Sequence, residues 1–336
     1  MEKNEKSLRE LDYVDRMLLN ELQAHFPIDR EPFSILGLTL GISEREVIDR
    51  VKRLKDTGVV RIIGPVFNAS TLGYRSTLVA AKIATDRIDA AGKAISERSD
   101  VGHCYERDHE INLWFTLTPP AAIDLQAELA DIKDRLGAEI LFDLPRLRTY
   151  KIITYFDANG EGCPTQTGKV GGVSGFNGKR AHLSLSDRAL ITELQSDIPL
   201  ISRPFDTLAN RLGMEISALL EHCRCLITRG IVRRYGASIS HQSIGYMANG
   251  MACWRVTSDK VEELGKRLAG IRAVGHCYER KTNMVWPYNL FSMIHGQTRE
   301  ECETIVEQVS REIGHNEYVM LFSNMEYKKL RVKYLV

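Results

Sequence analysis

The chain has 336 residues, of which 43% are apolar and 26% charged, and its formal net charge is +1. This composition is ordinary for globular protein, and the length allows two to four domains. No apolar run approaches the roughly 20 residues of a membrane helix, and the N-terminus lacks the apolar segment of a signal peptide. We therefore expect a cytoplasmic protein without membrane contact, and the near balance of charges argues against DNA as its main partner.

The cysteines exclude two further classes of protein. They number seven and are scattered along the chain, and no two of them are spaced as C-x-x-C. This pattern supports neither a zinc knuckle nor a disulfide framework. We expect no metal site built by the protein itself.

Two homologous halves make up the sequence. The string VGHCYER occurs at Val101–Arg107 and again at Val274–Arg280. An offset of 172 residues aligns further pairs, such as Gly64 with Gly236. A period this long indicates duplicated domains rather than a solenoid.

Each half begins with a helical head. In the first half, apolar spacing predicts three helices, the third of them started by a capping-box pattern at Ser43 and Glu46 and ended by Gly58. Two short extended runs then predict a hairpin, which completes a winged helix-turn-helix. The expected elements are Tyr13–Phe26, Phe33–Leu40, Ser43–Asp56, Val59–Ile63 and Pro65–Asn68.

The remainder of each half alternates as β-α-β-β-α-β, the order of a ferredoxin-like domain. One face of such a sheet lacks helices and must pack on a partner, for which the other half-chain is the obvious candidate. The elements expected in the first half are Ser76–Ala84, Ile88–Arg98, Val101–Glu106, Ile111–Leu117, Ala121–Leu136 and Glu139–Phe142. Those expected in the second half are Gly250–Val256, Val261–Leu268, Ala273–Tyr278, Met284–Ile294, Arg299–Ile313 and Tyr318–Phe322.

The predicted fold class is therefore α+β, a tandem duplication of a winged helix-turn-helix domain followed by a ferredoxin-like domain. A stretch rich in glycine and small polar residues between the halves is typical of a flexible linker. We expect the winged domains over 1–72 and 182–244, the ferredoxin-like domains over 73–157 and 245–336, and the linker over 158–181.

The third helix of each head would read DNA if the protein bound it. In the first half, five basic residues are interspersed with acidic ones along this helix. The equivalent helix, around Glu215–Thr228, has only Arg224 and carries His222, Cys223 and Cys225 instead. Because base reading and phosphate contacts need basic and polar side chains, the pattern favours a structural or assembly role over DNA binding.

The duplicated strand is the strongest indication of a functional site. Alternation along a strand places His103, Tyr105 and Arg107 on one face, and His109 joins them if the extended run continues. The second copy repeats the pattern with His276, Tyr278 and Arg280, but Thr282 stands where the first half has His109. Arginine binds carboxylates and histidine exchanges protons near neutral pH, so these rows suit an anionic ligand. The alternative is a sheet-face hydrogen-bond cluster without a ligand.

Aromatic residues follow each copy of this strand. Asn112 and Trp114 come after the first copy, and Asn289-Leu290-Phe291 echoes them after the second. Such residues usually fill a core. The alternative, given the adjacent polar row, is that they form the wall of a pocket for a flat ligand.

Several strings resemble a known family. The order of domains resembles that of the Lrp/AsnC regulators, whose ferredoxin-like unit is the AsnC-type domain. The particular strings are similar to those of siroheme decarboxylases, a branch of that superfamily. They include LDYVDRMLLNELQAHFPIDREPF, GVVRIIGPVFNASTLGYRSTLVAAKI, VGHCYERDHEINLWF, GIVRRYGAS and EYKKLRVKY. The resemblance covers nearly the whole chain apart from the linker.

The resemblance implies the non-oxidative removal of two acetate carboxyls from siroheme, which yields 12,18-didecarboxysiroheme on the route to haem or haem d1. Family members commonly pair two related subunits, which would here be joined as a pseudo-dimer in one chain. Homodimerisation of that chain stays open. No added cofactor is implied, because the iron belongs to the substrate. His103 and His109 are the expected catalytic pair, unless one of them contacts the iron axially. The expected substrate-binding residues are Tyr105, Arg107, Asn112, Trp114, Arg148, Lys151, His276, Tyr278, Arg280 and Arg331.

Two other functions stay open at this point. One is an Lrp/AsnC-type transcriptional regulator, which the net charge and the second head disfavour. The other is a non-catalytic module that binds haem or siroheme. A DNA mobility shift separates the first alternative from decarboxylation, and siroheme turnover separates the second.

Overall fold

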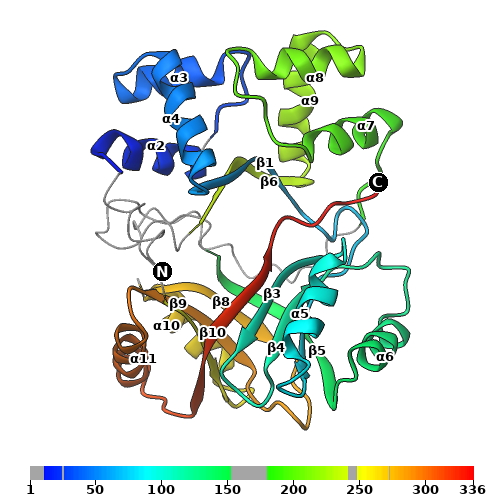
Figure 1. Ribbon diagram of the computed structural model, residues 1–336, viewed down its shortest axis with the longest axis vertical. Coiled ribbons are helices and arrows are strands. Elements are labelled where there is room, and N and C mark those ends of the chain that lie inside the picture. Colours follow the sequence, from blue (N-terminus) through cyan, green and yellow to red (C-terminus); the bar gives the residue numbers. More distant parts are fainter. Residues whose placement is uncertain (1–10, 25, 153–179, 241–247, 272) are drawn as a thin grey trace.

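The computed structural model describes residues 11–24, 26–152, 180–240, 248–271 and 273–336, in two layers. Figure 1 shows the helical heads of both halves at one end and a barrel of strands at the other. Most of the predicted linker, 158–179, lies outside the described residues, as does the predicted boundary at 244. No helix within the described residues is long and apolar enough to cross a membrane.

The two heads share one hydrophobic core. Each head has three helices, as the apolar spacing predicted, and a left-handed glycine ends the second helix of each, at Gly41 and Gly213. Ser43 caps its helix by accepting the Glu46 amide, but the Glu46 side chain pairs with Arg50 instead of completing the capping box. The helices are α2 (Tyr13–Ala24), α3 (Pro32–Leu40), α4 (Glu44–Asp56), α7 (Leu185–Leu194), α8 (Pro204–Leu212) and α9 (Ile216–Thr228).

A two-stranded sheet, which we call the wing sheet, joins the heads beneath their helices (Figure 1). It pairs β1 (Val60–Phe67) with β6 (Val232–Ile239) in antiparallel register, and Gly64 lies opposite Gly236. The predicted hairpin is therefore wrong. The backbone at Gly64 does not turn into the left-handed region, so the two extended runs form one strand that finds its partner in the other half.

Below the wing sheet, each half contributes four strands and two helices in the predicted β-α-β-β-α-β order. The first half supplies β2 (Thr77–Lys82), α5 (Ile88–Glu97), β3 (Val101–Arg107), β4 (Leu113–Leu117), α6 (Leu125–Leu136) and β5 (Ile140–Ile152). The second half supplies β7 (Ala248–Trp254), α10 (Val261–Gly270), β8 (Val274–Arg280), β9 (Leu290–Gly296), α11 (Arg299–Ile313) and β10 (Tyr318–Lys329). The last strand of each unit is much longer than the apolar pattern indicates.

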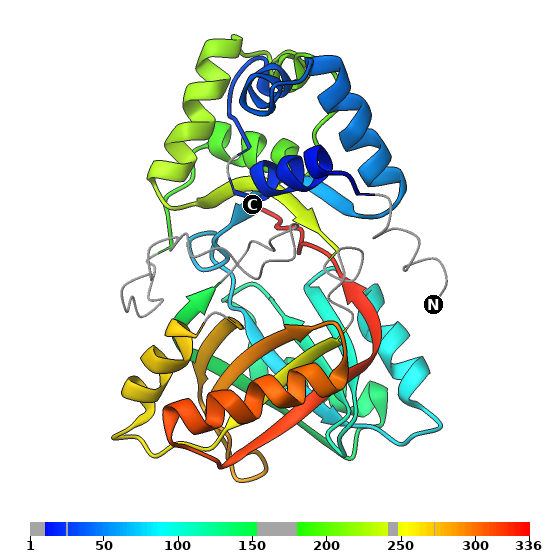
Figure 2. The same ribbon diagram turned by 90° about the vertical axis from the view of Figure 1, so that its left-hand side faces the viewer.

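These long strands close the barrel. β5 pairs with β2 of its own half and continues along β8 of the other, while β10 pairs with β7 and then with β3. The resulting order is β10-β3-β4-β2-β5-β8-β9-β7, with both edges of each sheet satisfied by the other half. The prediction that the free sheet faces pack on one another is confirmed, and Figure 2 shows the helices outside the barrel.

The barrel has an outer and an inner apolar layer. Outside, α5 and α6 cover one half of the sheet and α10 and α11 the other. Inside, Trp114, Leu144, Met251, Phe291 and Leu321 form a third cluster. Between the register shifts of β3, β5, β8 and β10, alternation assigns each barrel residue to a helix-facing or an inward-facing side.

The C-terminal segment 330–336 passes between the barrel and the wing sheet (Figures 1 and 2). The Leu330 amide donates to the Gly102 carbonyl of β3, and the Arg331 guanidinium donates to the carbonyls of Pro65 and Gly236. Tyr334 packs edge-to-face on Tyr74 at 5.0 Å between ring centroids. This segment fixes the wing sheet against the barrel end at which His103 lies.

Candidate functional site

Both copies of the VGHCYER strand direct their polar rows into the barrel. Tyr105 lies opposite Trp114, and Tyr278 lies opposite Phe291, and both of these partners belong to the inner cluster. Cys104 and Cys277 are buried in the outer clusters against the helices. The alternation inferred from the sequence therefore holds for His103, Tyr105 and Arg107 and for His276, Tyr278 and Arg280, which we call the first row and the second row.

An arginine ends each row, and Arg107 is buried whereas Arg280 is half-buried. Arg107 Nη1 donates to the Leu321 carbonyl of β10 at 3.0 Å, and Arg280 Nη1 donates to the Leu144 carbonyl of β5 at 2.9 Å. Among the described residues, neither guanidinium has a carboxylate partner, and neither Nε atom has any hydrogen-bond partner. Burial lowers the pKa of Arg280 to about 10 and shifts that of Arg107 in the same direction. A buried cation paired only with a carbonyl is a site for an anion.

Three histidines lie on the inner wall near the wing sheet. His103 and His276 belong to the rows, and His295 of β9 lies on the same side as Met293 and Phe291. Desolvation lowers the pKa of His276 to about 4 and that of His295 to about 3, with smaller contributions from neighbouring cationic groups. The pKa of His103 is lowered in the same direction, although its ring keeps solvent-exposed surface. For His276 and His295 the lowered pKa values favour the uncharged imidazole at neutral pH.

His109 does not continue the first row. The strand ends at Arg107, where the His109 amide turns back to the Arg107 carbonyl. The His109 Nδ1 atom accepts the Ile111 amide at 3.0 Å, and its ring packs edge-to-face on Trp286 at 5.4 Å between centroids. Four residues of strand, about 13 Å, separate His103 from Arg107, and His109 lies beyond Arg107. The two histidines therefore lie at opposite ends of the barrel wall.

Four other predicted site residues lie apart from the rows. The Asn112 side chain makes two hydrogen bonds with the backbone just after β2: it accepts from the Ile83 amide and donates to the Ile83 carbonyl. Arg148 and Lys151 oppose Glu279 and Cys277 in register, and so face the helices: Arg148 pairs with Glu262 and Glu279, and Lys151 donates to the Ile271 carbonyl. Arg331 binds carbonyls of the wing sheet. Trp114 does face inward, and its indole donates to the Ile111 carbonyl.

Several charged residues reach the rows from elements that the sequence analysis did not connect with them. Glu326 and Lys329 of β10 lie opposite Tyr105 and His103. Arg61 of β1 donates to the Glu326 carboxylate and to the Lys329 carbonyl, both at 2.9 Å. Arg233, which the repeat offset aligns with Arg61, lies near the second row. The arginine shared by GVVRIIG and GIVRRYG could have indicated Arg61 and Arg233.

Unsatisfied polar atoms gather on the same wall. Six buried side-chain atoms on inward-facing positions have no hydrogen-bond partner within the described part of the chain. They are Arg107 Nε, Thr149 Oγ1, Asn249 Oδ1, Arg280 Nε, Trp286 Nε1 and Ser323 Oγ. Buried polar groups in proteins are almost always paired, so a concentration of unpaired ones indicates where water or a polar ligand binds.

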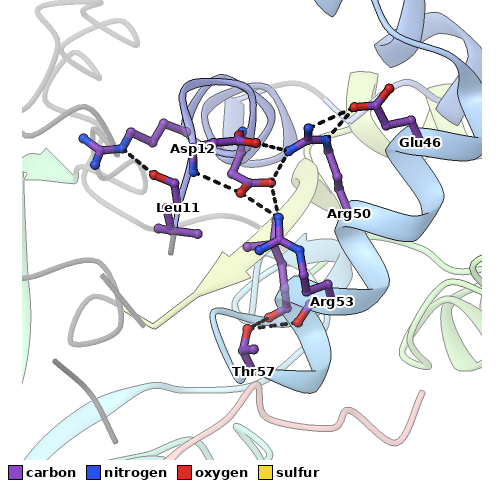
Figure 3. A network of polar contacts seen from close by, with 9 residues as sticks. Leu11, Asp12, Glu46, Arg50, Arg53 and Thr57 are labelled. Carbon is purple, nitrogen blue, oxygen red and sulfur yellow. Dashed lines mark hydrogen bonds and ion pairs between the residues drawn. The ribbon is translucent and has the colours of Figure 1, made fainter. Parts of the chain in front are cut away.

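The heads use their basic residues internally. Figure 3 shows Arg50 of α4 between Asp12 and Glu46. Arg50 and Arg53 also both contact the fully buried Asp15, at 2.9 and 2.6 Å. In the second head, Arg229 and His222 take the same role toward Asp187, each at 2.8 Å. These side chains stabilise the heads and are not available to phosphates.

The six described cysteines are free, and no group of three or more His, Cys, Asp or Glu side chains within the described ranges could hold a metal ion. The inner wall instead combines the guanidinium groups of Arg107 and Arg280, three imidazoles and aromatic side chains. That combination suits a large, flat ligand with several carboxylates.

Fold and site define a duplicated ligand-binding protein of the α+β, Lrp/AsnC-like class. The family model "AsnC-like ligand binding domain" matches residues 71–151 and 243–328. The model "Siroheme decarboxylase NirDL-like HTH domain" matches residues 15–61 and 187–233. Each half thus carries one match to each model, in the same order.

Comparison with similar proteins identifies the family within this class. A siroheme decarboxylase of Hydrogenobacter thermophilus is 35% identical over 328 residues, which are 94% of this chain and 93% of that one. A siroheme decarboxylase alpha subunit of Nitratidesulfovibrio vulgaris is 44% identical over 42% of this chain and 80% of its own length. The crystal structure of the siroheme decarboxylase NirDL with an iron-uroporphyrin III analogue is 32% identical, with a TM-score of 0.70 and coverage of 97% of this chain and 95% of that chain. The chain belongs to the siroheme decarboxylase family, with the counterparts of two subunits in one polypeptide.

Proposed function

We propose that this chain is a carbon–carbon lyase that removes two acetate carboxyls from siroheme, without an oxidant, and yields 12,18-didecarboxysiroheme for haem or haem d1 synthesis. The observation that carries the proposal is the inner wall of the barrel, where each of the two rows ends in an arginine that has no carboxylate partner among the described residues. Siroheme presents several carboxylates around a flat macrocycle, which is the complementary chemistry.

The residues suit this reaction. In each decarboxylation the bond between the acetate methylene and its carboxylate breaks, CO2 leaves, and the electron pair passes to the methylene carbon, where the conjugated macrocycle stabilises it. A proton then completes a methyl group. The protein needs to orient the macrocycle, exclude water from the carboxylate and supply that proton. We propose no additional cofactor, and the iron is part of the substrate.

We assign Arg107 and Arg280 to binding carboxylates, with Tyr105 and Tyr278 beside them. His103 and His109 remain our candidates for proton transfer and acetate orientation. Because they lie at opposite ends of the wall, they would serve different substituents of one macrocycle instead of a single acetate. An axial contact of either ring with the substrate iron is the alternative role.

The heads, which we regard as a tandem pair of winged helix-turn-helix units, serve assembly in this proposal. Four of the five basic side chains of α4 already form ion pairs with carboxylates. The wing sheet joins the halves and lies over the barrel. A transcriptional regulator would need those cations for phosphate contacts.

Anaerobic incubation with siroheme, followed by mass spectrometry of the tetrapyrrole, tests the proposal. We expect loss of two CO2, and strongly reduced turnover in His103→Ala and His109→Ala. Arg148→Gln, on the outer face, is the matched control and should turn over normally. Siroheme that binds but returns unchanged would favour a non-catalytic binding module, and a specific DNA mobility shift without turnover would favour a regulator.

A further inference from the structure

The tyrosines of the two rows have different hydrogen-bond partners, although the seven residues around them are identical. The Tyr105 hydroxyl donates to Glu326 Oε2 at 3.3 Å. The Tyr278 hydroxyl lies 3.3 Å from Nδ1 of His276 in its own row. The difference therefore comes from outside the repeated string.

The neighbouring strand explains the difference. Glu326 of β10 stands opposite Tyr105, and Thr149 of β5 stands opposite Tyr278. Arg61 holds the Glu326 carboxylate in place from the wing sheet, at 2.9 Å. The Thr149 hydroxyl is buried and has no hydrogen-bond partner among the described residues, so it makes no hydrogen bond with the Tyr278 hydroxyl.

This contrast leaves the two row histidines in different states. The only hydrogen-bond partner that the described residues offer to the His103 ring is the Thr116 hydroxyl, at 3.4 Å, which is a weak contact. His103 also keeps solvent-exposed surface. His276 is less exposed and its Nδ1 atom is engaged by Tyr278.

We propose that Glu326 is a positioning residue that makes the first row the reactive one: by accepting the Tyr105 hydroxyl it leaves the His103 ring available to the substrate, whereas Tyr278 holds His276. This inference rests on the proposed decarboxylation of siroheme. It assigns to β10, which belongs to the second half, a part in the site of the first half. It also explains how identical strands acquire different roles.

The hydrogen-bond part is tested without substrate. In Glu326→Thr, which reproduces the arrangement of the second row, we expect the Tyr105 hydroxyl to move to His103. Long-range ¹H–¹⁵N NMR of the histidine rings should then show His103 nitrogen shifts that approach those of His276. Glu106→Thr is the matched control. Glu106 lies on the outer face of β3, the strand that carries His103 and Tyr105, and accepts the Tyr327 hydroxyl at 3.4 Å. This variant should leave the His103 signals unchanged.

The catalytic part is tested by epistasis. We expect Glu326→Thr to lower kcat on the order of tenfold, the effect of about one hydrogen bond, with a smaller change in KM. Glu326→Gln, which still offers an oxygen to Tyr105, should retain most of the rate. Adding Tyr105→Phe to Glu326→Thr should restore kcat to the value of the Tyr105→Phe single variant, because the hydroxyl that engages His103 is gone. A merely structural role of Glu326 would not be rescued in this way.

The outcomes separate this inference from the proposed function. Unchanged His103 shifts in Glu326→Thr, an unchanged kcat, or no recovery in the double variant would each overturn the inference while wild-type turnover stands. A wild-type protein that fails to decarboxylate siroheme would remove the proposed function, and the NMR comparison would still decide whether Glu326 controls the His103 ring.

Discussion

Glu31 and Arg203 occupy equivalent positions in the two halves and form an ion pair with each other, with Arg203 Nη2 2.7 Å from Glu31 Oε1. Residues related by the repeat offset face each other only at the pseudo-twofold axis that relates the halves. Two identical halves would therefore place Glu against Glu or Arg against Arg there. The opposite charges favour pairing of unlike halves, as the adjacent Arg30–Asp206 pair also does.

Reversing one charge of this pair should destabilise the chain, and reversing both should restore it. For Glu31→Arg or Arg203→Glu we expect a loss of less than ~1 kcal/mol, because both side chains are about half exposed. Thermal unfolding of the two single variants and the double swap gives the coupling energy. Strictly additive effects would show that the pair contributes nothing to the choice of partner.

The two glycines of the wing sheet should tolerate alanine unequally. A Cβ atom at Gly236 would lie 2.9 Å from the carbonyl oxygens of Leu22 and Gln23, which are backbone atoms and cannot move aside. At Gly64 the nearest atom would be Nη1 of Arg331, at 3.3 Å. We expect Gly236→Ala to cost roughly 1–3 kcal/mol and Gly64→Ala clearly less. Urea unfolding measures both, and equal costs would contradict the packing described for this axis.

The buried arginines should matter for ligand binding more than for stability. We expect Arg107→Gln and Arg280→Gln to weaken binding of iron-uroporphyrin, followed by optical titration, by on the order of tenfold to a hundredfold. Arg148→Gln should bind as the wild type does, because Arg148 faces α10. Since neither buried guanidinium has a carboxylate partner in the described structure, the ligand-free variants should unfold at no lower a temperature than the wild type. Weaker folding with unchanged affinity would assign these arginines to the core instead.

Acid should destabilise the chain through its buried histidines. Desolvation lowers the pKa of His276 to about 4 and of His295 to about 3, whereas an unfolded histidine titrates near 6.5. Between these values the unfolded chain binds more protons, so the free energy of unfolding falls as the pH drops from ~6.5 toward ~4. Each histidine contributes at most ~1.4 kcal/mol per pH unit. Urea unfolding between about pH 4.5 and 7.5, the window set by these pKa values, measures this effect. The free energy of unfolding should fall less steeply with decreasing pH in His295→Gln than in the wild type. Identical slopes would show that His295 does not cause the acid sensitivity.

The order of the elements and the packing of one half on the other could be predicted from the sequence, but the strand pairing between the halves could not, which is also why the predicted hairpin was wrong. The β-α-β-β-α-β order and the inward direction of both rows follow from alternation, which depends only on neighbouring residues. The lengths of β5 and β10 were underestimated because their second parts pair with the other half, which no local apolar pattern reveals. Register shifts between Arg146 and Arg148 and between Thr149 and Lys151 place Arg148 and Lys151 on the outer face. Strict alternation along the strand would not have predicted these positions, and the strand itself was not predicted to extend so far.

The site was predictable only where it was duplicated. The verbatim repeat indicated His103, Tyr105 and Arg107, but the turn after Arg107 removed His109 from that row. Glu326 and Arg61 are 265 residues apart and meet only because β10 crosses to the first half beneath the wing sheet. Their contribution depends on closure of the barrel, and so it became visible only in three dimensions.

A structure of the protein with a bound carboxylated iron porphyrin tests the central claim most directly. We predict that the macrocycle lies inside the barrel between the first and second rows, with carboxylates on Arg107 and Arg280 and the His103 ring against one substituent. A ligand found outside the barrel, between the heads or on the surface of α4, would contradict the account.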